Sequence, residues 1–138
     1  MTLIAINLED QSIAMEISRL LTNVCSRNIE ASKNFYTSLF DFDVAFDSDW
    51  FVNLVSAGKG FEIGIILQEH DIIPEHVSGS IKGVYLTFVV ENVDTIFQKA
   101  QSSKLKIIQP PEVTPYGQKR MLIEAPEGTV CDVSSPAS

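Results

Sequence analysis

The sequence predicts a single α+β domain built from two βαβββ modules, and three observations support this fold class. First, the chain has 138 residues, the size of one ordinary domain, which buries about two-thirds of its unfolded surface. Second, 45% hydrophobic and 20% charged residues are typical of a globular protein. Third, the same order of strand and helix patterns occurs twice along the chain. One compact core formed by two similar halves is therefore expected.

The first half begins with a strand that leads into a capped helix. Apolar residues alternate from Leu20 to Cys25, and a polar turn follows, so Asn28 is expected to cap the helix. Helical spacing over residues 29–40 predicts a buried face formed by Ile29, Ser32, Phe35, Tyr36 and Leu39. Turn-forming residues then separate three expected strands at Phe42–Asp47, Trp50–Ser56 and Phe61–Leu67.

The second half repeats this order after a polar loop, roughly residues 68–82. A β-branched and aromatic run predicts a strand at Gly83–Val90, and Asn92 is expected to cap the second helix. The apolar face of that helix consists of Val93, Ile96, Phe97 and Ala100. The last three strands are expected at Lys106–Gln109, continuing past Pro110 and Pro111, at Gln118–Glu124 and at Thr129–Ser134.

An internal repeat supports the two modules. Placing Asn28 on Asn92 gives an offset of 92 − 28 = 64 positions, at which Val44 falls on Ile108. The repeat divides the single domain of residues 19–138 into modules of about residues 19–68 and 83–135. Residues 1–18 form an N-terminal extension, for which an edge strand, a short helix and a swapped arm all remain open.

Composition excludes several classes of function. A formal net charge of −8 disfavours nucleic acid and anionic membranes, because phosphate groups require clustered Lys and Arg. The opening segment lacks a basic stretch and contains Glu9 and Asp10, so neither a signal peptide nor a membrane span is expected. Cys25 and Cys131 are far apart and are expected to be reduced thiols in a cytoplasmic protein.

Three segments resemble the vicinal oxygen chelate superfamily, which includes glyoxalase I, bleomycin-resistance proteins and extradiol dioxygenases. They are N-I-E-A-S-K-N-F-Y at residues 28–36, Y-L-T-F-V-V-E-N-V-D at residues 85–94 and A-P-E-G-T-V-C-D-V at residues 125–133. The resemblance covers about residues 19–135. It implies a cupped, barrel-like mixed sheet with helices on the outside, around a site often formed at or across a homodimer interface.

The resemblance also implies where a metal would bind. Its enzymes place four ligands on the first and last strands of the two halves, which correspond here to Leu21, Glu62, Tyr85 and Asp132. Leucine has no donor atom and a neutral phenol is a poor ligand, so no catalytic metal is favoured. If a divalent metal does bind, Glu62 and Asp132 are the expected ligands.

Strand alternation then predicts the lining of the cup, which is apolar with a few polar groups, as a small-molecule site requires. The residues expected to contact a ligand are Leu21, Asn23, Trp50, Glu62, Tyr85, Thr87, Arg120 and Asp132. An alternative is that side chains simply fill the cup and that neighbouring donors satisfy the two carboxylates.

Five further side chains have more than one interpretation. Trp50 fits either an aromatic wall for a ligand or a dimer contact. If the side chain of Arg120 points inward, it is expected to pair with Glu62, with Asp132 or with an anionic group of the ligand. If it points outward, it is a surface charge. His70 and His76 are expected to be solvated loop residues rather than ligands, and Cys25 a small buried side chain rather than a nucleophile.

Together these observations predict a homodimeric protein that binds a small organic molecule, similar to the antibiotic-sequestering members of the family. The alternative is a lyase, isomerase or dioxygenase similar to glyoxalase I, with a divalent metal and Glu62 as a catalytic carboxylate base. A regulatory or interaction module is a third possibility.

Overall fold

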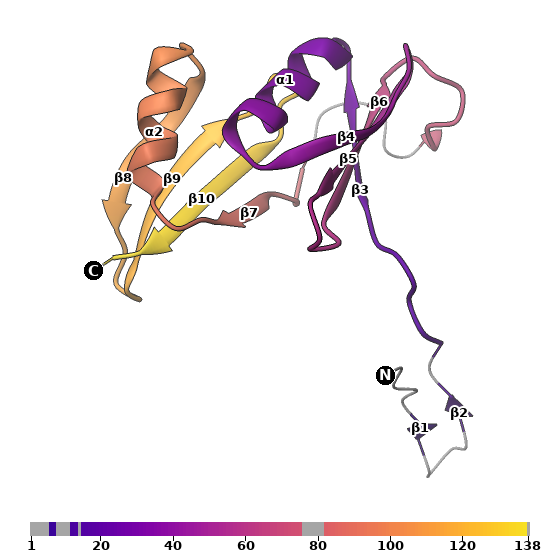
Figure 1. Ribbon diagram of the computed structural model, residues 1–138, viewed down its shortest axis with the longest axis horizontal. Coiled ribbons are helices and arrows are strands. Elements are labelled where there is room, and N and C mark those ends of the chain that lie inside the picture. Colours follow the sequence, from indigo (N-terminus) through magenta and orange to yellow (C-terminus); the bar gives the residue numbers. More distant parts are fainter. Residues whose placement is uncertain (1–5, 8–11, 14, 76–81, 138) are drawn as a thin grey trace.

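The computed structural model describes residues 6–7, 12–13, 15–75 and 82–137 and contains the two modules that the sequence predicts (Figure 1). Module 1 consists of β3 (Thr22–Ser26), α1 (Ile29–Leu39), β4 (Phe42–Asp47), β5 (Phe51–Ser56) and β6 (Glu62–Leu67). Module 2 consists of β7 (Leu86–Val89), α2 (Val93–Ser102), β8 (Lys106–Val113), β9 (Gln118–Glu124) and β10 (Val130–Pro136). Each module therefore has the order βαβββ.

Each module forms a four-stranded sheet with the same connectivity. The strand order is β3-β6-β5-β4 in sheet 1 and β7-β10-β9-β8 in sheet 2. In both sheets the first strand of the module is parallel to the last, whereas the other neighbours are antiparallel. A parallel pair requires a long crossover connection, which the helix and the two intervening strands provide.

Both helices begin where the sequence predicts a cap. The side chain of Asn28 accepts a 3.0 Å hydrogen bond from the backbone N–H of Ala31, and that of Asn92 accepts one of 2.9 Å from Asp94. Each bond satisfies one of the donors that the first helical turn leaves free. The buried face of α1 consists of Ser32, Phe35, Tyr36 and Leu39, which confirms the predicted helical spacing.

The prolines of β8 fit its place at the edge of sheet 2. Pro110 and Pro111 cannot donate to a ladder, and proline inside a sheet is confined to edge strands and bulges. The pairing with β9 accordingly shifts its register between Gln109 and Glu112. This irregularity lets β8 continue past the prolines, as the sequence predicts.

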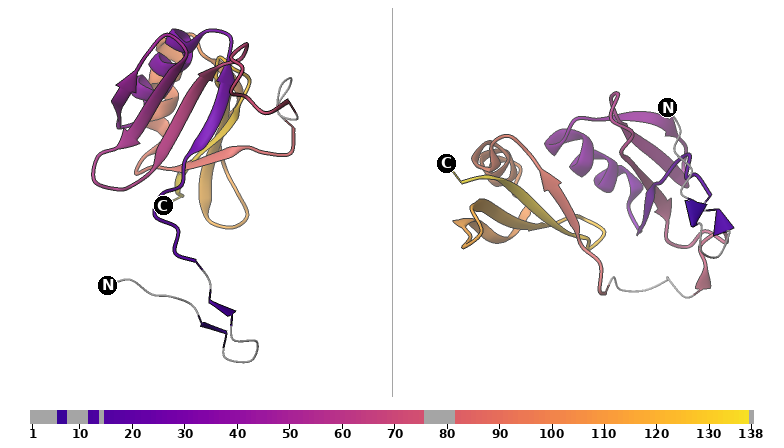
Figure 2. Two further views of the ribbon diagram at one scale, coloured as in Figure 1. Left: turned by 90° about the vertical axis from the view of Figure 1, so that its right-hand side faces the viewer. Right: turned by 90° about the horizontal axis from the view of Figure 1, so that it is seen from below.

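One hydrophobic core holds the two modules together, with α1 between the sheets (Figures 1 and 2). On the side of module 1, α1 packs on β4, β5 and β6, whose core side chains include Val52, Leu54 and Ile65. On the side of module 2, the ring of Phe40 stacks on that of Phe88 in β7, with centroids 4.1 Å apart. Side chains of α1 and of its C-cap residue Phe40 therefore contact both modules.

Because α1 packs on the side of sheet 1 that faces sheet 2, the other side of sheet 1 is turned away from sheet 2. The two sheets are curved, but they are not closed into a barrel (Figure 2). Each sheet keeps one side that neither helix covers, which we call its uncovered face. A cup bounded by both uncovered faces is thus not formed within one chain.

The described residues of the N-terminal extension lie apart from the modules (Figures 1 and 2). Its strands β1 (Ile6–Asn7) and β2 (Ser12–Ile13) pair with each other, and residues 15–20 are exposed on the way to β3. Residues 76–81, which include His76, lie outside the described residues. No helix in the described part of the chain is long and apolar enough to cross a membrane.

Candidate functional site

The uncovered face of sheet 1 carries three rows of side chains that the pairing register defines. The middle row contains Asn23, Gly64 and Asn53, which lie opposite one another on neighbouring strands. The residues next to them, Val24, Ile65 and Val52, are buried in the core, so the middle row points to the other side. The same alternation places Phe51, Ile66 and Cys25 in one flanking row, and Val55 and Glu62 in the other.

Arg19 binds both oxygens of Glu62. Its Nε donates to Oε2 and its Nη2 donates to Oε1, each at 2.6 Å. Asn53 joins this pair, because its Nδ2 donates to Oε1 of Glu62 at 3.2 Å. Hydrogen bonds from Arg19 lower the pKa of Glu62, and the same contact raises the pKa of Arg19. Glu62, which was predicted to contact a ligand and considered as a catalytic base, therefore lies in a charge-compensated cluster, although Arg19 itself remains 57% exposed.

Gly64 leaves room for a neighbouring amide. A Cβ atom at this position would lie 2.1 Å from Oδ1 of Asn23 and 3.0 Å from Cε1 of Phe51. The Asn23 side chain therefore lies across the glycine, on the uncovered face. Asn23 and Asn53 together place two amide groups in the middle of this face.

The uncovered face of sheet 2 carries a second pair of opposite charges. Asp132 lies between Thr87 and Leu122 in the ladder, and the neighbouring row contains Val89, Ser134 and Arg120. Nε of Arg120 lies 3.1 Å from Oδ2 of Asp132, and Oγ of Ser134 donates to Oδ1 of Asp132 at 2.6 Å. The Arg120–Asp132 contact lacks hydrogen-bond geometry, so the buried Nε of Arg120 has no hydrogen-bond partner in the described structure.

The four positions that the family resemblance assigns to a metal do not fit one. Leu21 supplies no donor atom, and Glu62 is bound by Arg19. Tyr85 precedes β7 and is 57% exposed. The residue opposite Asp132 in the ladder is Thr87 and not Tyr85. Among the described residues, no three His, Cys, Asp or Glu side chains form a group that could hold a metal ion. Both carboxylates that a metal would need have an arginine beside them instead.

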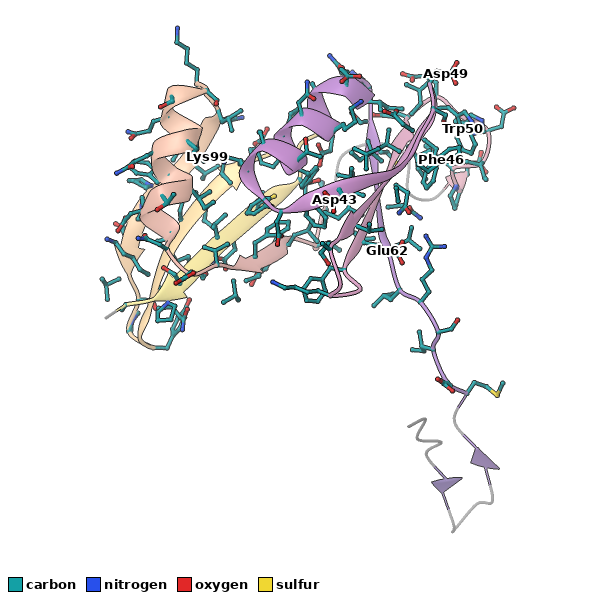
Figure 3. The ribbon with its side chains drawn as sticks, in the orientation of Figure 1. Asp43, Phe46, Asp49, Trp50, Glu62 and Lys99 are labelled. Atoms are coloured by element: carbon teal, nitrogen blue, oxygen red, sulfur yellow. The ribbon has the colours of Figure 1, made fainter. Side chains whose placement is uncertain are left out.

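An aromatic cluster stands at the far end of sheet 1 from Glu62 (Figure 3). Trp50 stacks on His70, with ring centroids 4.1 Å apart and planes 15° apart, and lies 5.6 Å from Phe51. Phe46 lies 6.0 Å from Phe51 and is 53% exposed. His70 of the loop thus contacts the aromatic ring of Trp50 and not the carboxylates of Glu62 or Asp132.

The two cysteines are free and have different surroundings. Burial raises the pKa of Cys25, which is half-buried in β3, and raises that of Cys131, which lies in the core, to about 12. A thiol with a raised pKa is a poor nucleophile. The placement of Cys25 agrees with its interpretation as a small apolar side chain.

Two residues of the site, Arg19 and Asn53, were not singled out from the sequence. Strand alternation could have placed Asn53 on the uncovered face, because it lies between the core residues Val52 and Leu54. Arg19 gave no such signal. It precedes the first strand by three positions and reaches Glu62 across 43 residues of sequence.

Two fused βαβββ modules with these curved sheets define the class of protein. A sequence profile of the glyoxalase-like domain matches residues 20–138, and the chain therefore belongs to this family. This finding confirms the resemblance to the vicinal oxygen chelate superfamily. No curated protein sequence matches the chain significantly.

Solved structures show the same fold. A glyoxalase/bleomycin resistance protein/dioxygenase family enzyme from Burkholderia phytofirmans PsJN is 22% identical, with a TM-score of 0.73 over 84% of this chain and 96% of that chain. TnmS3, an antibiotic binding protein from Streptomyces sp. CB03234, is 23% identical, with a TM-score of 0.69 over 89% and 99%. Lactoylglutathione lyase from Agrobacterium tumefaciens is 14% identical, with a TM-score of 0.66 over 88% and 96%. At these identities the likeness establishes the fold alone.

Proposed function

We propose that this chain binds a small organic molecule on the uncovered face of sheet 1, without a catalytic metal. The proposal rests on the bidentate contact between Arg19 and Glu62, in which each carboxylate oxygen accepts a hydrogen bond of 2.6 Å. A carboxylate held in this way has its lone pairs directed at a guanidinium and is not available to a metal. Its lowered pKa also makes it a weak base for proton abstraction.

The rows on this face support a particular chemistry for the ligand. Phe51 and Phe46, with Trp50 beyond them, offer aromatic area on which a planar ring system can stack. The amides of Asn23 and Asn53 offer donors and acceptors in the middle of the face. A planar, largely aromatic molecule with carbonyl or hydroxyl groups on one edge suits this arrangement.

A second copy of the chain would complete the site. The uncovered face of sheet 1 is turned away from sheet 2 of its own chain, so a cup around the ligand requires another sheet. The uncovered face of sheet 2 exposes 74% of Val89 and presents Arg120, whose buried Nε lacks a hydrogen-bond partner in the described structure. We therefore propose a homodimer in which Thr87, Arg120 and Asp132 of a second copy contact the ligand, with Tyr85 and Leu21 at the rim.

The fold neighbour that binds an antibiotic suggests the compounds to test first. TnmS3 shows that this fold can accommodate an antibiotic. Polycyclic aromatic antibiotics combine planar rings with carbonyl and hydroxyl groups, which is the chemistry that the rows on sheet 1 favour. Sequestration of such a molecule requires affinity but no chemical step.

The test combines a metal assay with a binding titration. Protein purified without chelator is analysed for Mn, Fe, Ni and Zn, and polycyclic aromatic compounds are then titrated while the fluorescence of Trp50, the only tryptophan, is followed. We expect less than about 0.1 transition-metal ion per chain, and we expect the compounds to quench the fluorescence of Trp50 in a saturable way. Phe46→Ala should weaken binding about fivefold by removing stacking area. Tyr116→Ala, which removes an exposed ring of the β8–β9 turn, is the matched control and should leave the affinity unchanged.

Two results would overturn the proposal. A stoichiometric transition metal, lost together with an activity on treatment with chelator, would favour the glyoxalase I-like enzyme. Equal effects of the Phe46 and Tyr116 substitutions on affinity would show that the ligand does not lie on sheet 1.

A further inference from the structure

A cleft of about 420 Å³ lies where the two modules meet, and Glu62, Thr87 and Val89 of the uncovered faces also line it. We call it the seam cleft. Its volume falls in the range of small-molecule sites, roughly 300–1,000 Å³. The residues that line it are Thr22, Phe40, Asp41, Phe42, Lys59, Phe61, Glu62, Ile63, Leu86, Thr87, Phe88, Val89 and Val90.

Part of the lining of the seam cleft lies on the helix side of the sheets. Thr22 and Ile63 pair with each other on the side of sheet 1 that carries the core, and Phe88 pairs with the core residue Val133 in sheet 2. These side chains therefore point away from the rows that contain Asn23 and Glu62. A molecule in the seam cleft would not contact the middle row of the uncovered face.

Two unpaired strand edges explain why the seam stays open. β3 pairs only with β6 and β7 only with β10, so each is an edge strand of its sheet. The described ladders do not join β3 to β7, and a strand edge without a partner presents free N–H and C=O groups. The seam cleft thus combines an apolar interior with backbone donors and acceptors along β7.

The walls of the seam cleft are rich in phenylalanine. Four of the eight phenylalanines in the chain line it, namely Phe40, Phe42, Phe61 and Phe88. Phe88 is held between two of them, stacked on Phe40 at 4.1 Å and edge-on to Phe42 at 6.4 Å. Phe61 belongs to the turn at the mouth and is 63% exposed. Three of these rings form an apolar floor, and the exposed ring of Phe61 adds apolar area at the mouth.

Lys59 supplies a positive charge at this mouth. Its ammonium group makes no ion pair in the described structure, whereas the charge of Glu62 beside it is already compensated by Arg19. Asp41 also lines the seam cleft but is not within ion-pair distance of Lys59. An anionic group at the mouth would therefore meet an ammonium group with no competing partner.

We propose that the seam cleft is a second binding site, for an aromatic or aliphatic molecule with one anionic head group. The apolar body lies against the phenylalanine walls, and the carboxylate, sulfonate or phosphate group contacts Lys59. Of the residues proposed to contact the ligand on sheet 1, Glu62 and Thr87 also line this site, but Asn23, Asn53 and Trp50 do not, so either proposal can fail without the other.

Two fluorescent probes of nearly the same shape test this proposal. 1-Anilinonaphthalene-8-sulfonate carries an anionic group, and N-phenyl-1-naphthylamine is its neutral analogue. Both are titrated into the full chain and into the variants Phe61→Ala, Lys59→Gln, Phe46→Ala and Lys99→Gln. All four positions are exposed, and Lys99 lies on α2, away from the seam cleft.

We expect Phe61→Ala to weaken both probes about fivefold, because it removes ring area from the mouth. Lys59→Gln should weaken the sulfonate about threefold, the size of an exposed ion pair, and leave the neutral probe unchanged. Phe46→Ala and Lys99→Gln should change neither. An unchanged affinity in Phe61→Ala would place the probes elsewhere and overturn the site. An equal effect of Lys59→Gln on both probes, or no effect on either, would overturn the anionic head group.

Discussion

The phenol of Tyr36 donates a 2.5 Å hydrogen bond to the carboxylate of Glu127, and this bond joins α1 of module 1 to the β9–β10 turn of module 2. Two more hydroxyls donate to the same carboxylate, from Ser32 at 2.8 Å and from Thr129 at 2.6 Å. Tyr36 is fully buried, and burial raises its pKa well above the ordinary value, so the phenol remains a donor. The seam between the modules is thus held by polar contacts as well as by the core.

Tyr36→Phe is expected to destabilise the protein by about 2 kcal/mol, because it removes a buried hydrogen bond to a charged acceptor. Equilibrium unfolding in urea measures the change. Tyr116→Phe is the matched control, since Tyr116 is 66% exposed, and its effect should stay within about 0.5 kcal/mol. Equal midpoints for the two variants would show that Glu127 is satisfied without Tyr36.

Arg19→Ala is expected to raise the pKa of Glu62 toward its ordinary value, because it removes the hydrogen bonds that lower this pKa. NMR titration of the glutamate carboxyl carbons measures the shift. Lys106→Ala, which breaks the exposed pair with Glu124, is the control and should leave Glu62 unchanged.

The same pair gives a pH dependence of stability. A carboxyl group whose pKa is lowered by folding stabilises the native state fully above its unfolded pKa and loses this contribution as the pH falls through its folded pKa. Wild-type protein should therefore lose more stability than Arg19→Ala between neutral pH and the acid range. Parallel pH–stability curves for the two proteins would contradict the role of Arg19.

Gly64→Ala is expected to displace the Asn23 side chain, because the new Cβ would lie 2.1 Å from Oδ1 of Asn23 and 3.0 Å from Phe51. Asn23 can swing away, so the loss of stability should be modest, about 1 kcal/mol. The affinity for the ligand on sheet 1 should also fall, because the amide of Asn23 leaves the middle row. Asn23→Ala is the comparison, and the two variants should bind equally weakly. Normal affinity in Gly64→Ala would exclude Asn23 from the site.

The two thiols are expected to react at very different rates with a disulfide reagent. With a pKa of about 12, Cys131 has only about one part in ten thousand as thiolate at pH 8, and it is also buried. Cys25 is half-buried, and its pKa is raised by burial, so it should react slowly in the native state. We expect one reactive thiol in the native protein and two in denaturant. Cys25→Ser should abolish the native signal, and a native signal that survives this substitution would show that the core opens at Cys131.

Local pattern was sufficient to predict the elements of the fold. Asn28 and Asn92 cap the helices as expected, and the strand at Phe42–Asp47 has the predicted bounds. The larger differences are at strand ends, for instance β7, which is shorter than the predicted strand at Gly83–Val90. Helical and strand periodicities report burial within a single element, and this is the information that neighbouring residues in a sequence contain.

The partners of the site residues could not be predicted in the same way. Sequence alternation placed Glu62 on a ligand-facing side, but its contact with Arg19 spans 43 residues and depends on how the chain enters β3. For Arg120 the sequence allowed either a surface charge or an ion pair with Glu62 or Asp132. In the structure Arg120 forms an ion pair with Asp132. A long, flexible side chain can reach several neighbours, and only their positions in space decide among them.

The sequence by itself determined the two βαβββ modules, their helix caps and the family, because each depends on periodicity and on short motifs. Only the tertiary structure decided that α1 lies between the sheets, so that their uncovered faces are not turned toward each other within one chain. It also decided that each of the two carboxylates lies beside an arginine. Both outcomes follow from packing the modules around one core, and such packing joins residues that no local pattern connects.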